Sequence, residues 1–93
     1  MIRGFKDKAA EALFRGEPIA KRLRAIATLT RRKLDMLDYA EALKDLMAPP
    51  GNRLEALKGD RRGQYSIRIN DQWRICFVWG EDGPYDFEVV DYH

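Results

Sequence analysis

The sequence contains one cysteine, Cys76, and one histidine, His93, and each scarcity excludes a class of protein. One cysteine cannot form an internal disulfide, so the chain is not a disulfide-stapled secreted domain and fits a reducing compartment. One cysteine and one histidine cannot by themselves supply the nitrogen and sulfur ligands of a zinc site, so no metal is expected. The apolar neighbours Ile75 and Phe77 favour a buried structural thiol at Cys76 over a reactive one.

Long apolar runs and nucleotide-binding glycine motifs are also missing. Because no stretch of about 18 apolar residues occurs, and no cationic start precedes an apolar run, we expect a cytoplasmic protein that does not bind membranes. Neither GxGxxG nor GxxxxGK[ST] is present, so we expect no nucleotide cofactor. The hydrophobic fraction is 45% of 93 residues, which is enough for one domain, residues 1–93, around a single core.

Charge is distributed unevenly along the chain, although the net charge is only +2. Residues 19–34 carry six cations and no acid, residues 51–74 carry six cations and three acids, and residues 75–93 carry five acids and no cation. Such segregation favours basic surfaces that meet a polyanion. The alternative at this point is a solvated helix face without a partner.

The first half of the chain is predicted to be helical after a short strand at Ile2–Phe5. A short helix is expected over Asp7–Arg15, ended by Gly16, and Pro18 can open a second helix because proline fits a first turn. Apolar residues at helical spacing follow at Ile19, Leu23, Ile26, Thr30, Leu34 and Leu37, with cations on the opposite side at Lys21, Arg24, Arg31 and Arg32. A third helix, at about Tyr39–Met47, is expected to bury Leu43, Leu46 and Met47 before Pro49, Pro50 and Gly51 end it.

The second half changes to a period of two, with aromatic and β-branched residues at alternate positions, which predicts strands. The alternating apolar sets are Tyr65, Ile67 and Ile69, then Trp73, Ile75, Phe77 and Trp79, then Tyr85, Phe87 and Val89. Turns are expected at Asn70–Gln72 and Gly80–Pro84. This order predicts an α+β domain in which helices pack on one face of a sheet.

The predicted hairpin constrains the positions of two arginines. If Ile69 and Trp73 face the same core across a three-residue loop, Arg68 lies opposite Arg74 on the other face. Like charges directly across a strand pair are destabilising, so a carboxylate of this chain or a phosphate of a ligand should visit that face. The alternative is that both side chains splay into water.

Two further segments have a composition suited to nucleic acid. The loop Leu57–Gln64 combines two glycines with three cations, which can bring backbone and guanidinium groups close to a phosphate. The sequence closes with Asp91, Tyr92 and His93: histidine can transfer protons near neutral pH, tyrosine can stack on a base, and aspartate can orient a neighbour. An ordinary soluble loop and a frayed terminus are the alternatives.

The second half resembles the HigB family of the RelE/ParE superfamily of toxin–antitoxin toxins. The resemblance rests on the runs Pro50–Leu54, Leu57–Asp60, Gln64–Phe77 and Val89–His93. It implies a RelE-like twisted antiparallel sheet with two to three N-terminal helices packed on one face. It also implies cleavage of mRNA on the ribosome, neutralisation by a HigA-like helix-turn-helix antitoxin, and contact with operator DNA only through the antitoxin complex.

By motif match, the resemblance assigns active-site roles to Lys58, Arg74, Asp91, Tyr92 and His93. It departs at Glu55, where several relatives carry a histidine, so the general base could be His93, Asp91 or Glu55. The candidate RNA-binding side chains are Arg53, Arg61, Arg62, Arg68 and Asn70.

The implied reaction is attack of the substrate's 2′-hydroxyl on the adjacent phosphate, which needs proton transfer and cations but no metal. Two alternatives stay open at this stage. One is a toxin-like fold that inhibits gyrase or the ribosome without catalysis, and the other is a basic RNA- or protein-binding module.

Overall fold

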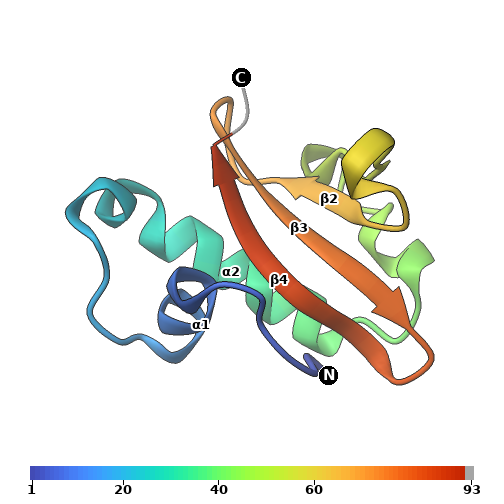
Figure 1. Cartoon of the computed structure of the whole chain (residues 1–93), viewed down its shortest axis with the longest axis horizontal. Coiled ribbons are helices and arrows are strands. Elements are labelled where there is room, and N and C mark those ends of the chain that lie inside the picture. Colours follow the sequence, from blue (N-terminus) through green and yellow to red (C-terminus); the bar gives the residue numbers. More distant parts are fainter. Residues whose placement is uncertain (92–93) are drawn as a thin grey trace.

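The computed structural model describes residues 1–91 and contains one four-stranded antiparallel sheet with helices packed on one face (Figure 1). The strands are β1 (Glu55–Ala56), β2 (Tyr65–Arg68), β3 (Trp73–Gly80) and β4 (Gly83–Asp91), and they lie side by side in chain order. Strands β3 and β4 are long and curved, and they are joined by a tight turn (Figure 1). This architecture confirms the predicted α+β class, with helices against a meander.

Helix α1 (Lys8–Arg15) forms where the sequence predicts it, because both of its ends are capped locally. The Asp7 carboxylate accepts a hydrogen bond from the Ala10 amide at 2.7 Å, and Gly16 ends the helix in the left-handed conformation with φ 73°. The strand expected at Ile2–Phe5 is not present. The segment forms an isolated parallel bridge from Phe5 to Phe87, and the Arg3 amide donates to the Pro84 carbonyl at 2.9 Å, but these contacts do not continue into a ladder.

The second helix is split, which corrects the prediction of one continuous helix after Pro18. Residues Lys21–Ile26 form a 3₁₀ helix, η1, and only Ala27–Tyr39 form the α-helix α2. Ala20 offers η1 no capping side chain, and Ile26 has ψ 0°, which is outside α-helical geometry. Five of the six expected positions are nevertheless buried, namely Leu23, Ile26, Thr30, Leu34 and Leu37, whereas Ile19 precedes η1 and is only partly buried.

The third predicted helix is reduced to a 3₁₀ turn, η2 (Leu43–Leu46). The Asp45 carboxylate accepts hydrogen bonds from the amides of Glu41 and Ala42, which stops α2 from continuing into this segment. Leu46 is fully buried, but Met47 is 68% exposed, so the prediction that Met47 is buried was wrong. Two further short 3₁₀ turns, η3 (Pro50–Asn52) and η4 (Gly59–Arg61), flank β1.

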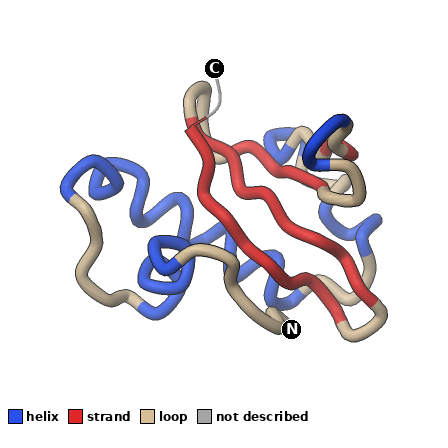
Figure 2. Tube along the Cα trace, viewed as in Figure 1, coloured by secondary structure: helices blue, strands red, loops and turns tan. Residues whose placement is uncertain are grey.

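Helical segments lie at both lateral edges of the sheet (Figure 2). Helix α1 contacts both α2 and β4, whereas η3 contacts β2 at the opposite edge. In residues 1–91, no helix has both the length and the apolar character that crossing a membrane would require.

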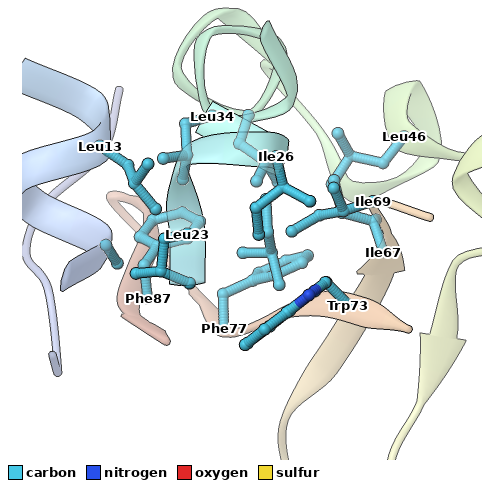
Figure 3. Packing of buried hydrophobic residues seen from close by; sticks show 13 residues of the cluster. Leu13, Leu23, Ile26, Leu34, Leu46, Ile67, Ile69, Trp73, Phe77 and Phe87 are labelled. Atoms are coloured by element: carbon cyan, nitrogen blue, oxygen red, sulfur yellow. The ribbon is translucent and has the colours of Figure 1, made fainter. Parts of the chain in front are cut away.

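One hydrophobic core fills the space between the helices and the inner face of the sheet (Figure 3). Its fully buried side chains come from both layers: Leu23, Leu34, Leu37 and Leu46 from the helical layer, and Ile67, Ile75, Phe77 and Phe87 from the strands. The rings of Phe77 and Phe87 stack with centroids 5.6 Å apart. The core therefore occupies one face of the sheet and leaves the other for polar side chains.

Candidate functional site

The sheet face opposite the helices, here called the outer face, carries the polar side chains of the strands. Because side chains alternate along a strand, the burial of Ile67 and Ile75 in the core directs their neighbours outward. The outer face is formed by Glu55 on β1, Ser66 and Arg68 on β2, Arg74 and Cys76 on β3, and Glu88 and Val90 on β4.

Arg74 is the most constrained cation of the outer face. Only 7% of its surface is exposed. Its Nε donates to the Ser66 hydroxyl at 2.8 Å, and its Nη2 donates to the backbone carbonyl of Arg53 at 2.7 Å. A second Nη2 contact reaches the Ser66 carbonyl at 3.4 Å. These contacts from two elements fix the plane of the guanidinium, which is the geometry that directional phosphate recognition requires.

The register confirms that Arg68 lies directly opposite Arg74. An anion of this chain contacts one of the two arginines: the Asp71 carboxylate of the hairpin loop forms a salt bridge with Arg68. The predicted carboxylate of this chain is therefore present. It pairs with Arg68, whereas Arg74 is held by Ser66 and by the Arg53 carbonyl.

Two predicted site residues, Asn70 and Asp91, form hydrogen bonds with the hairpin loop. The Asn70 side-chain oxygen accepts hydrogen bonds from the amides of Gln72 and Trp73, both at 2.8 Å, which closes the three-residue turn. The side-chain Nε2 of Gln72 donates to the Asp91 carboxylate at 3.2 Å. Asp91 pairs with Trp73 on β3, the residue that precedes Arg74. Because side chains alternate along a strand, the Asp91 side chain leaves the sheet on the side opposite to Arg74.

Arg61 covers the middle of the outer face. From η4 it reaches across the sheet to the Glu88 carboxylate at 2.9 Å, and Lys6 approaches the same carboxylate at 3.6 Å. The hydrogen bond from Arg61 is the main cause that lowers the pKa of Glu88. Beneath this bridge Cys76 is buried, and burial raises the pKa of its thiol, as the prediction of a structural cysteine requires.

Lys58 lies in a groove along β1 and η4. The groove has a volume of about 460 Å³, within the range of small-ligand pockets, and is lined by Glu55, Ala56, Leu57, Lys58 and Arg61. Glu55 pairs with Ser66, so the groove adjoins the outer face. Arg62 lines the neighbouring hollow with Lys58. Within residues 1–91, no three His, Cys, Asp or Glu side chains are placed to hold a metal ion.

A second basic surface lies on η1 and α2. Its exposed cations are Lys21, Arg22, Arg24, Arg31 and Arg32, and none of them forms an ion pair with residues 1–91. The Arg22 guanidinium lies 5.5 Å from the centroid of the Trp73 ring, a cation–π contact that joins η1 to the start of β3. This basic surface therefore approaches the end of the sheet at which the β2–β3 hairpin lies.

The structure brings together Arg74, Arg68, Glu55 and the backbone of Arg53, and it places Lys58, Arg61 and Arg62 along the adjoining groove. The predicted site residues Tyr92 and His93 lie outside the described residues. Sequence reasoning missed Ser66 and Asn52. The strand alternation could have identified Ser66 as a neighbour of both arginines, whereas Asn52 makes its contacts with residues distant in sequence, which no local pattern signals.

Comparison with known proteins shows the same assignment over almost the whole chain. Residues 3–93 match the family model of the RelE-like HigB toxin of type II toxin–antitoxin systems. Toxin HigB-1 of Vibrio cholerae serotype O1 is 44% identical over 83 residues, covering 85% of this chain and 84% of that protein. Endoribonuclease HigB of Proteus vulgaris is 33% identical, and the alignment covers all of both proteins.

A solved structure shows the same fold at lower identity. The chain superimposes with a TM-score of 0.61 on a chain of the YoeB–YefM complex from Staphylococcus aureus, at 21% identity, covering 100% of this chain and 95% of that one. The predictions of a toxin, of an endoribonuclease class and of a RelE-like fold are confirmed. The chain belongs to the HigB-like family of RelE-like toxins of type II toxin–antitoxin systems.

Proposed function

We propose that this chain is a ribosome-dependent mRNA endoribonuclease that acts in the cytoplasm as one toxin domain, residues 1–93. The observation that carries the proposal is the guanidinium of Arg74, which is almost buried and held by Ser66 and Arg53 on the outer face. Burial of a cation costs desolvation free energy, which the hydrogen bonds to Ser66 and Arg53 help to offset while they orient the guanidinium. A scissile phosphodiester has the charge and the oxygen geometry that such a fork binds.

The proposed reaction uses a nucleophile that the substrate carries. The 2′-oxygen forms a bond to phosphorus, the bond from phosphorus to the 5′-oxygen breaks, and the products are a 2′,3′-cyclic phosphate and a 5′-hydroxyl. A base takes the proton of the 2′-hydroxyl and an acid protonates the leaving oxygen, so the reaction needs no metal ion. Arg74 and Lys58 stabilise the charge on phosphorus, with Arg68 in a lesser role because Asp71 neutralises it.

Proton transfer is assigned to Glu55 or His93, and Asp91, whose side chain leaves the sheet on the side opposite to Arg74, is assigned the role of orienting a neighbouring side chain. Glu55 is exposed and belongs to the outer face, whereas Asp91 is exposed at the end of β4. Tyr92 stacks on the displaced base in this proposal. The residues proposed to contact the flanking RNA are Arg53, Arg61, Arg62 and Asn70. Asn70 would use its side-chain nitrogen, because its side-chain oxygen closes the hairpin turn.

The ribosome is proposed to supply the positioning that a small open site cannot supply. In this proposal the message arrives already splayed, so that the 2′-hydroxyl aligns with the phosphate. The exposed cations of η1 and α2 are suited to the ribosomal RNA backbone. Each phosphate contact of this kind makes binding weaker as salt concentration rises.

The partner that silences the toxin is proposed to be a HigA-like helix-turn-helix antitoxin. Membership of a toxin–antitoxin family supports an antitoxin of some kind, and the solved YoeB protein is in a complex with YefM. The toxin would then meet operator DNA only as part of the complex with that antitoxin.

The test is a translation reaction with a defined message, ribosomes and the purified chain. We expect a cut that requires ribosomes, is lost when the scissile nucleotide carries a 2′-deoxyribose, and leaves a 2′,3′-cyclic end. R74A should reduce the cleavage rate by 100-fold or more (on the order of an electrostatic contact to the transition state). R15A is the matched control, because Arg15 is an exposed arginine of α1 that pairs with Glu11 away from the outer face.

Cleavage of naked RNA at the same rate would contradict the ribosome dependence. Growth arrest with intact messages would replace the nuclease with a non-enzymatic inhibitor of gyrase or of the ribosome. A chain that neither arrests growth nor cuts messages would be a binding module.

A further inference from the structure

We propose that Asn52 is a positioning residue that sets the orientation of Arg74 by fixing the backbone carbonyl of Arg53. The proposal rests on the nuclease function proposed above, and it adds a residue from the core side of the molecule to the site. Asn52 is a fully buried polar side chain, and it immediately precedes the residue whose carbonyl holds Arg74.

The Asn52 amide is held by three contacts from separate elements. Its Nδ2 donates to the Leu46 carbonyl at 3.1 Å and points to the Met36 sulfur at 3.1 Å, and its Oδ1 accepts from Lys33 Nζ at 2.5 Å. Burying an amide is costly unless its polar atoms are paired, so these contacts permit a single orientation of the side chain. The η3 turn is therefore fixed to α2 and to η2.

The backbone that follows adopts a conformation that ordinary residues avoid. Arg53 has φ 44° and ψ 55°, in the left-handed region, and it is one of two described residues other than glycine with positive φ. Such a conformation in a residue with a Cβ persists only where the surroundings enforce it. The Asn52 anchor on one side and the Arg74 hydrogen bond on the other provide that enforcement.

The strained turn has a direct consequence at the site. It directs the Arg53 carbonyl at Arg74 Nη2 at 2.7 Å, while Ser66 holds Nε at 2.8 Å. Two acceptors on different nitrogens define the plane of the guanidinium, and the shorter of the two Nη2 contacts is the one to the Arg53 carbonyl. A fork that recognises a phosphate loses much of its effect when it is displaced by about 1 Å, which can reduce a reaction rate on the order of 100-fold.

The test compares N52A and N52D with the wild-type chain in the ribosome assay. We expect the cleavage rate at saturating programmed ribosomes to fall by tenfold or more (on the order of a misplaced catalytic contact), with the half-saturating ribosome concentration unchanged. The fall should disappear in the R74A background, because no guanidinium is left to orient. An equal fall in both backgrounds would overturn the proposal.

Two controls separate positioning from a general loss of stability. L34A opens a cavity in the core without removing a polar contact of Asn52, and it should remain faster than N52A when both are assayed below their unfolding midpoints. T30V changes another buried polar residue, whose hydroxyl has no hydrogen-bond partner among residues 1–91, and should leave cleavage unchanged. If L34A is as slow as N52A, then Asn52 acts only through stability and the proposal fails.

A spectroscopic measurement tests the positioning without activity. The Nε–H proton of Arg74 should exchange slowly with water in the wild-type chain and at least tenfold faster in N52A (on the order of losing one constraining contact). If N52A does not fold, N52S is the second variant for both measurements. If R74A loses cleavage while N52A shows normal cleavage and normal exchange of the Arg74 Nε–H proton, this inference alone is overturned. If the wild-type chain is inactive, the proposed function is overturned as well.

Discussion

The hydrogen bond between Ser66 and Arg74 provides a direct test of how the outer face is stabilised. S66A removes the hydroxyl that accepts from Arg74 Nε at 2.8 Å, and the Ser66 side chain is fully buried. Because Arg74 is only 7% exposed, water cannot readily replace the lost acceptor. A hydrogen bond to a charged group contributes about 1.5–3 kcal/mol, so the free energy of unfolding should fall by about 2 kcal/mol.

In a domain of this size, a loss of about 2 kcal/mol lowers Tm by about 8–16 °C. The measurement is denaturant unfolding of the wild-type chain, S66A, R74M and the double variant. When Arg74 is replaced by an apolar side chain, the Ser66 hydroxyl no longer has a charged donor, so the additional cost of S66A should be about 0.5 kcal/mol or less. The same loss in both backgrounds would refute the reasoning, because the hydroxyl would then be stabilising something other than Arg74.

Three further predictions concern the rest of the fold. E88Q should reduce stability at neutral pH, and its difference from the wild-type chain should disappear in acid. The Arg61 hydrogen bond lowers the folded pKa of Glu88, so the contribution of Glu88 is present above the carboxyl's unfolded pKa and is lost as pH falls through the folded pKa. The measurement is the free energy of unfolding of both chains at a series of pH values. A difference between the wild-type chain and E88Q that persists in acid would contradict this explanation. D7A should cost about 1–2 kcal/mol, because the carboxylate caps α1 and also accepts from the Val89 amide at 3.1 Å, and loss of α1 helicity by circular dichroism would accompany it. T30V should leave stability unchanged or increase it, since its buried hydroxyl has no partner among residues 1–91, and a loss above about 1 kcal/mol would show that the hydroxyl is bonded.

Local signals determined the elements that the sequence predicted correctly. The strand positions follow from the alternation of apolar and polar residues, and the hairpin register follows from a three-residue loop between two such strands. The alternation was wrong at Tyr85, because an irregularity at Asp86, which has φ 56°, puts Tyr85 on the face opposite to Phe87. Helix α1 follows from Asp7 and Gly16 at its ends. These features depend on neighbours within a few residues, which a reader of the sequence can see.

Local signals failed where a competing interaction came from farther away. Met47 occupies a helical position in the sequence, but the Asp45 cap turns the chain before that face can reach the core. Strand β1 has only two residues, so it has no period to detect, and it forms because β2 offers an unpaired edge.

At the site, the sequence by itself supplied the residue types and the pairing of Arg68 with Arg74, because both depend on one hairpin. Only the tertiary structure decided how each arginine is held, since Asp71 pairs with Arg68 while Ser66 and Arg53 orient Arg74. The distinction depends on the direction of side chains and on a carbonyl held by the buried Asn52. Direction and burial arise when distant segments pack together, and they are not encoded in the spacing of residues along the chain.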